Sequence, residues 1–194
     1  MTTTYDDAMS MGAARQRYFD ANGFDGAYAE RWVKLKAGPI AFYFPNAEGR
    51  RRAVKFHDLH HIATGYQTDW TGEAEIGGFE IGGGCGPFVW AWMLNLQAMF
   101  LGLLMAPRAL FHAFVRGRHS RTLYHQGEFQ DAMLTRSVGE IRRDLALDQP
   151  TPPASAADIA AFMFWSTLSV LWTIWPFALL VWWLAKNHGF HGSV

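Results

Sequence analysis

Apolar positions along the chain recur mainly at the three- and four-residue spacing of amphipathic helices. Residues 6–21 have this spacing and predict a short helix that ends at Asn22-Gly23. The same spacing predicts a helix over 51–64 with Gly65 as its C-terminal cap, and another helix that begins near Gly72. The pattern therefore favours an all-α protein.

Four further segments have less regular patterns. Residues 26–37 predict a short helix that ends at the breaker pair Gly38-Pro39, and 40–44 predict a strand or an extended apolar plug. A helix is expected over 122–134. Ser137 and the glutamate three residues later form a capping-box pattern, which opens a helix to about residue 147.

The predicted helix near Gly72 runs into a glycine-rich stretch. Glycine inside a helix costs up to about 1 kcal/mol relative to alanine, so its repeated use suggests a reason in packing. The candidates are close approach of two helices, room for a ligand, or simply a loose turn. The stretch comprises Gly77, Gly78, Gly82, Gly83, Gly84 and Gly86.

Two long segments carry no charged residue. Residues 88–106 are borderline for a membrane span and have basic residues on both sides, so we expect a buried or membrane-grazing helix that lines an apolar lipid cavity. Residues 159–185 would measure roughly 40 Å as a helix, enough to cross a bilayer. Trp165 and Trp182-Trp183 fit interfacial anchors, and Pro176 predicts a kink.

These segments divide the chain into five parts. We expect an N-terminal tail, a helical metal- and lipid-binding domain, a proline-rich linker, one transmembrane helix and a C-terminal tail, over residues 1–14, 15–147, 148–158, 159–187 and 188–194. Arg142 and Arg143 lie before the apolar helix and only Lys186 follows it, a bias that predicts a cytoplasmic N-terminal domain at a membrane, the inner membrane if the source is bacterial.

Composition narrows the function classes. The chain has 194 residues, of which 50% are hydrophobic and 18% charged, and its 17 basic residues balance 17 acidic ones. Without net positive charge, nucleic acid is not an expected partner. Cys85 is the only cysteine, so no internal disulfide forms. Asp6 and Asp7 argue against a secretory signal or mitochondrial presequence, which favours the cytoplasmic side.

The clearest chemical pattern is His57-Asp58-x-x-His61, followed after eleven residues by Glu73. On a helix, His57 and His61 project from one face, and an incoming carboxylate would complete a divalent-metal site. Asp58 is a further candidate ligand. The alternative without a function is a pair of solvent-facing histidines on a helix.

Two enzyme classes fit the histidines less well. A zinc peptidase of the H-E-x-x-H type needs glutamate where this chain has Asp58, which is one methylene shorter. A di-iron desaturase or hydroxylase could use His57, His60 and His61, but needs about eight histidines around several spans. The remaining histidines are scattered: His112, His119, His125, His188 and His191.

A basic run precedes the motif. Its simplest interpretation is a solvated helix face. The more specific interpretation is a basic edge of the site that binds an anionic group, such as a phosphate or carboxylate, near the metal. The run consists of Arg50, Arg51, Arg52 and Lys55.

The pattern His57-Asp58-x-x-His61-x11-Glu73 resembles that of the coenzyme Q biosynthesis protein 4 family. The similarity extends to the flanks and covers roughly residues 15–147. The flanking residues that carry it are Tyr18 to Asp25, Gly65-Tyr66, Gly72-Glu73, Phe79-Glu80 and Ser137 to Leu147. The apolar helix over 159–185 is an addition, so the chain looks like a membrane-anchored relative.

The resemblance implies a mostly helical fold whose apolar tunnel holds an isoprenoid-tailed molecule, and a role in ubiquinone synthesis. It implies that His57, Asp58, His61 and Glu73 hold a divalent metal, zinc first and magnesium or iron as alternatives. Oxidative decarboxylation of a polyprenylated ring is the implied reaction, and Asp58 could instead act as its base. The residues expected to bind the prenylated quinone or another lipid are Arg52, Lys55, Phe79, Glu80, Trp90 and Phe100.

A non-catalytic function is the alternative. The aromatic-rich helix could pack against partner helices, with Trp172, Trp175 and Trp182 at the contact. The protein would then be an accessory subunit or a lipid-binding scaffold of a membrane complex, with other quinone-synthesis or membrane proteins as partners.

Overall fold

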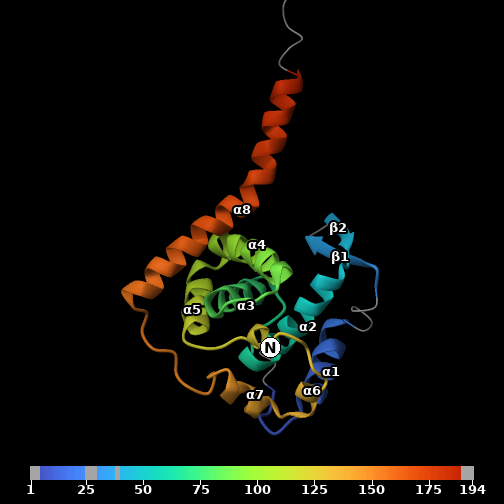
Figure 1. Ribbon diagram of the computed structural model, residues 1–194, viewed down its shortest axis with the longest axis vertical. Coiled ribbons are helices and arrows are strands. Elements are labelled where there is room, and N and C mark those ends of the chain that lie inside the picture. The colour runs from blue at the N-terminus through green and yellow to red at the C-terminus, as the bar shows by residue number, and fades with distance from the viewer. Residues whose placement is uncertain (1–4, 25–29, 38–39, 189–194) are drawn as a thin grey trace, which may run out of the picture.

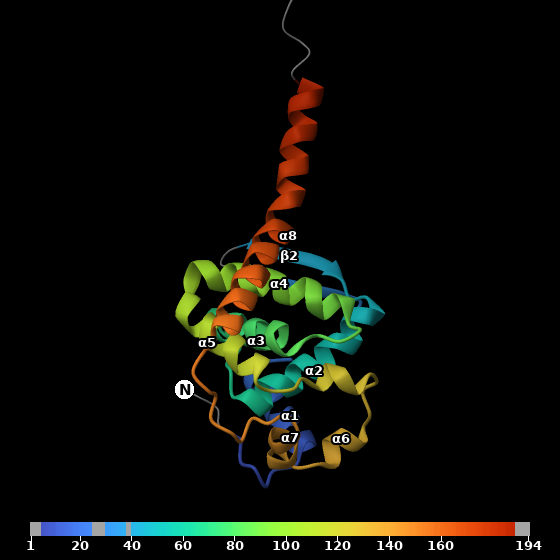
Figure 2. The same ribbon diagram turned by 60° about the vertical axis from the view of Figure 1, so that its left-hand side comes forward.

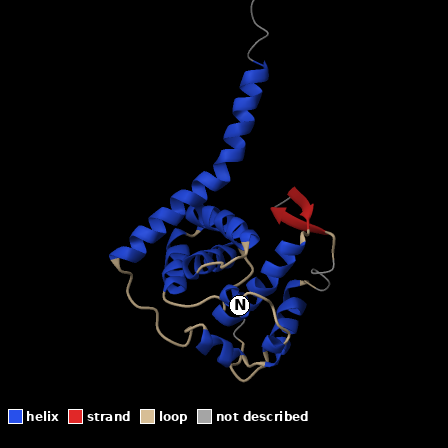
Figure 3. Cartoon of the chain, in the orientation of Figure 1, coloured by secondary structure: helices blue, strands red, loops and turns tan. Residues whose placement is uncertain are grey.

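The computed structural model in Figure 1 describes residues 5–24, 30–37 and 40–188. Within them the chain is mostly helical, with one two-stranded antiparallel hairpin (Figure 3), which confirms the all-α prediction. The elements are α1 (Met11–Asn22), β1 (Trp32–Ala37), β2 (Ile40–Pro45), α2 (Glu48–Thr64), α3 (Trp70–Gly83), α4 (Val89–Met105), α5 (Pro107–Arg118), the 3₁₀ turn η1 (Leu123–Gln126), α6 (Ala132–Thr135), α7 (Val138–Asp144) and α8 (Ala156–His188).

Helix α3 lies at the centre of the domain and packs against α4 and α5 (Figures 1 and 2). Glycines bring α3 and α5 into backbone contact. A Cβ atom on Gly82 would collide with the Phe114 carbonyl oxygen, and one on Gly117 would collide with the Phe79 carbonyl oxygen. The glycine-rich stretch therefore allows close helix packing, the first of the three interpretations. Gly84 and Gly86 follow the helix with positive φ angles.

The helix predicted over 26–37 was wrong for its described part. Trp32–Ala37 forms strand β1, which pairs antiparallel with β2 in a register that joins Trp32 to Pro45 and Ala37 to Ile40. Residues 26–29 lie outside the described residues. The apolar segment 40–44 supplies a partner strand next to the Gly38-Pro39 pair, so pairing overrides a weak helical pattern.

The helix predicted over 122–134 was also wrong. The chain there forms the short turn η1 and then the single helical turn α6. Gly127 interrupts them with φ 78°, a conformation that continues no right-handed helix. By contrast, the capping box at the start of α7 is confirmed: the Ser137 side chain accepts from the Glu140 backbone, and the Glu140 carboxylate accepts from the Ser137 N–H.

Most of the predicted N-terminal tail belongs to the folded domain. Tyr5 is 5% exposed, and Ser10 forms a β-bridge with Ser137. The Ser10 side chain also caps α1 by accepting from the Ala13 N–H at 3.2 Å, so the helix begins later than the predicted residue 6. Segments from both ends of the domain therefore lie side by side.

Helix α8 has two halves that differ in their surroundings. The docked half, residues 156–173, packs on α4 and α5: Trp165 stacks on Trp92 with ring centroids 5.0 Å apart, and the Ser169 hydroxyl donates to the Leu96 carbonyl at 2.7 Å. At its start, Asp158 accepts from Arg118 Nε at 2.6 Å. The predicted linker is correspondingly shorter, because α8 already begins at Ala156.

The protruding half of α8, residues 174–187, leaves the domain (Figure 2). All of its described side chains are solvent-exposed. By length and composition, Ala156–Asn187 is long and apolar enough to cross a membrane, as predicted for this region.

Candidate metal centre

Two helices and the tight loop between them bring the predicted metal ligands together. Helix α2 places His57 and His61 four residues apart on one face. It ends at Gly65, whose φ of 82° turns the chain back, and Asp69 caps the start of α3 by accepting from the Gly72 N–H at 2.8 Å. Glu73 thereby falls in the first turn of α3, opposite the histidines.

The three side chains form one cluster. Nε2 of His57 lies 3.1 Å from Nε2 of His61. The Glu73 carboxylate oxygens lie 3.6 Å from Nε2 of His57 and 3.5 Å from Nε2 of His61. Zinc bonds its ligands at about 2.0–2.1 Å in a tetrahedron, so two ligand atoms on one ion stand about 3.3 Å apart. The observed spacings match those of ligands around one small divalent cation.

Hydrogen bonds orient both imidazoles. Nδ1 of His61 lies 3.0 Å from the Tyr66 carbonyl oxygen, which only accepts, so Nδ1 carries a hydrogen. Nδ1 of His57 lies 3.0 Å from the Glu80 carboxylate and donates to it in the same way. Each ring therefore turns Nε2 towards the other and towards Glu73, the arrangement that metal-binding histidines adopt.

The charges at the centre favour a cation. Burial alone would lower the pKa of His57, but the Glu80 and Glu73 carboxylates outweigh it and raise this pKa well above its ordinary value. Burial and the neighbouring His57 lower the pKa of His61 to about 4. Burial acts to raise the pKa of Glu73, yet the two histidines lower it overall. The metal-free cluster thus holds one proton on His57 beside a neutral His61 and an ionised Glu73.

The centre is open on one side. The side chain of His61 is 1% exposed, whereas those of His57 and Glu73 are 22% and 40% exposed. An ion held by these three groups would therefore keep coordination positions for water or a substrate, as catalytic metal sites do.

Glu80 organises a buried polar network behind the centre. Its carboxylate is fully buried and accepts from His57, from Nδ1 of His60 at 2.7 Å, from the Tyr124 hydroxyl at 2.8 Å and from the Asn95 amide. Burial would raise the pKa of Glu80, but His57 and His60 hold it well below its ordinary value. The Glu80 carboxylate therefore supports His57 from within the core, which differs from the predicted contact with a lipid.

The sequence analysis did not predict this network, although the sequence contains a signal for it. Glu80 follows Glu73 by seven residues, two helical turns along the same face of α3, and His60 follows His57 by three. Nε2 of His60 accepts from the Leu123 N–H at 2.8 Å, so both of its ring nitrogens are used inside the protein. His60 therefore has a structural role, away from the metal ligands.

The structure separates Asp58 from the three clustered ligands. Among the described residues, the group whose ligand atoms lie within 4.8 Å of one another consists of His57, His61 and Glu73. Asp58 is 5% exposed on α2, and its charge acts on Arg50. The predicted roles of Asp58 as a ligand or a base gain no support from this arrangement.

The other predicted lipid contacts are spread over the domain. Arg52 pairs with Glu48 at 2.7 Å on the exposed face of α2, which fits the solvated interpretation for this residue. The other members of the basic run are only partly exposed, and Arg50 donates to the Asn46 side chain at 2.8 Å. Lys55 lies 5.3 Å above the Phe129 ring. Phe79 is fully buried against His60 and Tyr66, and Trp90 and Phe100 are half-buried on α4. These residues surround no common binding cavity among the two hollows described next.

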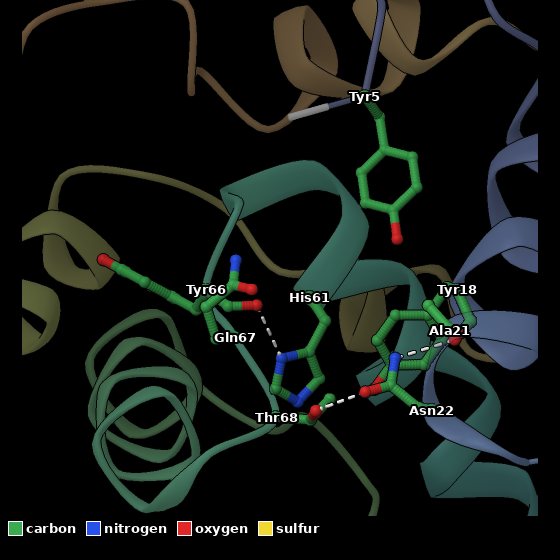
Figure 4. A pocket seen from close by; sticks show the side chains of 8 residues that line it. All are labelled: Tyr5, Tyr18, Ala21, Asn22, His61, Tyr66, Gln67 and Thr68. Carbon is green, nitrogen blue, oxygen red and sulfur yellow. Dashed lines mark hydrogen bonds between the residues drawn. The ribbon is translucent and has the colours of Figure 1, made fainter. Parts of the chain in front are cut away.

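A small hollow of about 190 Å³ adjoins His61 (Figure 4). Polar side chains from the start of the chain, α1 and the α2–α3 loop dominate its lining, which differs from the predicted apolar lipid cavity. The lining residues are Tyr5, Tyr18, Ala21, Asn22, His61, Tyr66, Gln67 and Thr68. Tyr18 stacks on His61 with centroids 5.7 Å apart, and Thr68 donates to Asn22.

A second hollow, of about 320 Å³, lies on the docked half of α8. Its lining is almost entirely apolar: Met163, Phe164, Thr167, Leu168 and Leu171.

Comparison of the chain with models of protein families, with curated proteins and with solved structures gave no match. The chemistry of the centre therefore follows from its own geometry: two oriented imidazoles and one carboxylate around a space of the size of a divalent ion, open on one side and backed by Glu80.

Proposed function

We propose that this protein is a membrane-anchored, divalent-metal-dependent protein of ubiquinone biosynthesis. It binds a polyprenylated benzoquinone precursor beside the metal and takes part in oxidative decarboxylation of the ring, in which the ring carboxyl leaves as CO2, a hydroxyl from water takes its place, and an external two-electron acceptor takes up the electrons. The observation that carries the proposal is the convergence of His57, His61 and Glu73. These residues stand in a sequence pattern that resembles the pattern of the coenzyme Q biosynthesis protein 4 family.

The donor set supports zinc as the first candidate metal, with magnesium or iron as alternatives. Two imidazole nitrogens and a carboxylate are typical zinc donors, whereas magnesium prefers oxygen ligands alone. When bound, the ion would supply a positive charge that attracts an anionic oxygen of the ring, either carboxylate or phenolate. The protein's own part is to orient Nε2 of His57 and His61 through Glu80 and the Tyr66 carbonyl.

The apolar helix α8 supports a membrane location. A polyprenyl tail partitions into a bilayer, so an enzyme that uses such a substrate benefits from being held there. The uncharged stretch of α8 and the exposed tryptophans Trp175 and Trp182, 48% and 59% exposed, fit lipid as the surroundings. We place the N-terminal domain on the cytoplasmic side of the membrane, on the basis of Arg142 and Arg143.

The first experiment is metal analysis of the purified protein. We expect close to one divalent ion per chain, lost in His57→Ala and kept in His112→Ala. The control residue, His112, lies exposed on α5 and contacts none of the three ligands in the described structure. Equal metal contents in the two variants would contradict the proposed centre.

The second experiment tests the pathway. Cells that depend on this protein should lose ubiquinone and accumulate a carboxylated prenyl precursor when they carry His57→Ala, but not when they carry His112→Ala. Normal ubiquinone with a metal-free variant would instead favour the accessory or scaffold function. The exposed tryptophans of the protruding half favour this second candidate, because they would also suit packing against partner helices.

A further inference from the structure

The dimensions of α8 pose a problem for a simple tether. The docked half is fixed to α4 and α5, so only residues 174–187 are free to enter a bilayer. At about 1.5 Å per residue they reach roughly 21 Å, whereas the hydrocarbon layer measures about 30 Å. If the domain stayed in water, the end of the helix and Lys186 would stop inside the hydrocarbon.

If helix α4 also entered the membrane surface, the protruding half of α8 would reach further into the bilayer. Helix α4 lies at the end of the domain from which the protruding half leaves, in both Figure 1 and Figure 2. Its outward side exposes large apolar residues, with Leu104 and Met105 being 69% and 57% exposed, and Val89 66%. Residues 88–106 contain no charge at all. Water is an unfavourable neighbour for such a face, and a lipid layer suits it.

The docked half of α8 extends this apolar surface. Met163 and Phe164 are 60% and 62% exposed, and Leu171 is 61% exposed. The first charged side chain beyond α4 is the exposed Arg108, three residues after Met105, where a guanidinium can reach lipid phosphates while its neighbours enter the acyl layer.

We propose that the outward face of α4 and the docked half of α8 together form a lipid-binding platform that sits in the boundary between headgroups and acyl chains. Helices that lie in the membrane interface bury their apolar face about 5–10 Å into the boundary between headgroups and acyl chains. With the platform at that depth, the protruding half reaches roughly 26–31 Å beyond the headgroup–acyl boundary, close to the hydrocarbon thickness of about 30 Å, so Lys186 can approach the far headgroups. The occupant of the apolar face is thus the bilayer itself. This inference rests on the membrane attachment proposed above for α8.

Depth measurements on the full chain test the platform. Single cysteines at Leu104, Leu179 and Arg143 would carry an environment-sensitive fluorophore in phosphatidylcholine vesicles. Arg143 is the control, because it is exposed on α7 at the opposite end of the domain (Figure 1). The native Cys85 is fully buried, so unsubstituted protein gives the labelling blank.

The expected result is a blue-shifted label at position 104 that shallow lipid quenchers reach, a label at 179 that deep quenchers reach, and a label at 143 that aqueous iodide quenches. If iodide quenched the label at position 104 as strongly as the label at position 143, while the label at 179 remained in lipid, only α8 would contact the membrane. That result would contradict the platform. A label at position 179 that remains in water would instead contradict the membrane attachment of α8 itself. A lipid-free blue shift at 104 that grows with protein concentration would show that a second copy covers the face, and would also overturn the proposal.

A charge variant provides an independent readout. Leu101→Glu with Leu104→Glu should lower the vesicle partition coefficient at least about tenfold, because two leucines no longer enter the lipid. Thr135→Glu, on the far end of the domain, should leave it unchanged. Both sites of the double variant are exposed on the helix surface, and a circular dichroism spectrum identical to that of the parent would show that the fold is intact. An unchanged partition coefficient with an intact fold would contradict the platform.

Discussion

Nε2 of His57 and Nε2 of His61 face each other at 3.1 Å, while the Nδ1 atoms of both rings donate to acceptors behind them. Two bare lone pairs at this distance repel, so the pair requires a cation between or upon them. A proton meets this need in the metal-free protein, and a divalent ion would meet it in the proposed metal-bound state. The two states of the centre are therefore linked through His57.

This linkage predicts proton release when the metal binds. Because the carboxylates hold the pKa of His57 well above its ordinary value, the free centre carries a proton at neutral pH that the metal must displace. Metal affinity should therefore fall as the pH falls. Titration calorimetry at pH 7 in buffers of different ionisation enthalpy should report about one proton released per ion. No dependence of the measured heat on the buffer would contradict this.

Glu73 contributes the only negative charge among the three ligands. Glu73→Gln keeps the size of the side chain but removes that charge, and we expect metal affinity to fall by at least about tenfold. Glu75→Gln, two residues along the same helix, is the matched control and should bind metal normally. Competition with a coloured chelator measures both. Equal affinities would show that the carboxylate is no ligand.

Removal of the Glu80 charge should disturb both stability and the centre. Glu80→Gln leaves His57, His60 and the Tyr124 hydroxyl without their ionised acceptor inside the core, which should cost about 3–5 kcal/mol of unfolding free energy. Metal affinity should fall by about 10–100-fold, as for other partners of metal-binding histidines. Urea denaturation of the metal-free proteins and a metal titration separate the two effects. Wild-type values in both would refute the supporting role of Glu80.

The glycine contact between α3 and α5 should tolerate no side chain. Gly117→Ala would force its Cβ against the Phe79 carbonyl, and relief requires that the two helices move apart. We expect a loss of about 1–3 kcal/mol, opposite in sign to the small gain that alanine gives in an unhindered helix. Thermal unfolding compares this variant with Arg143→Ala on the exposed face of α7. A stabilised Gly117→Ala protein would show that the contact is loose.

The sequence predicted the elements whose causes are local. The two-histidine spacing on α2, its Gly65 cap and the capping box of α7 each depend on residues within one or two turns, and the structure has all three. The hairpin depends on a partner strand, and the predicted helix over 122–134 ignored the break at Gly127, so both predictions were wrong. The sequence does not reveal the burial of Glu80, because its partners come from three separate elements, α2, α4 and η1, which meet only in the folded domain.

Arg142 has a consequence for the order in which the centre is completed. Its guanidinium, on α7, donates to the Ile62 and Ala63 carbonyls in the last turn of α2, and also to the Tyr5 carbonyl. All three candidate ligands leave the ribosome about seventy residues before Arg142 does. During synthesis, the helix that bears both histidines therefore has an unfinished end until α7 arrives. If the proposed centre binds a metal, the binding site would be complete only after α7 has packed on the end of α2 and on Tyr5.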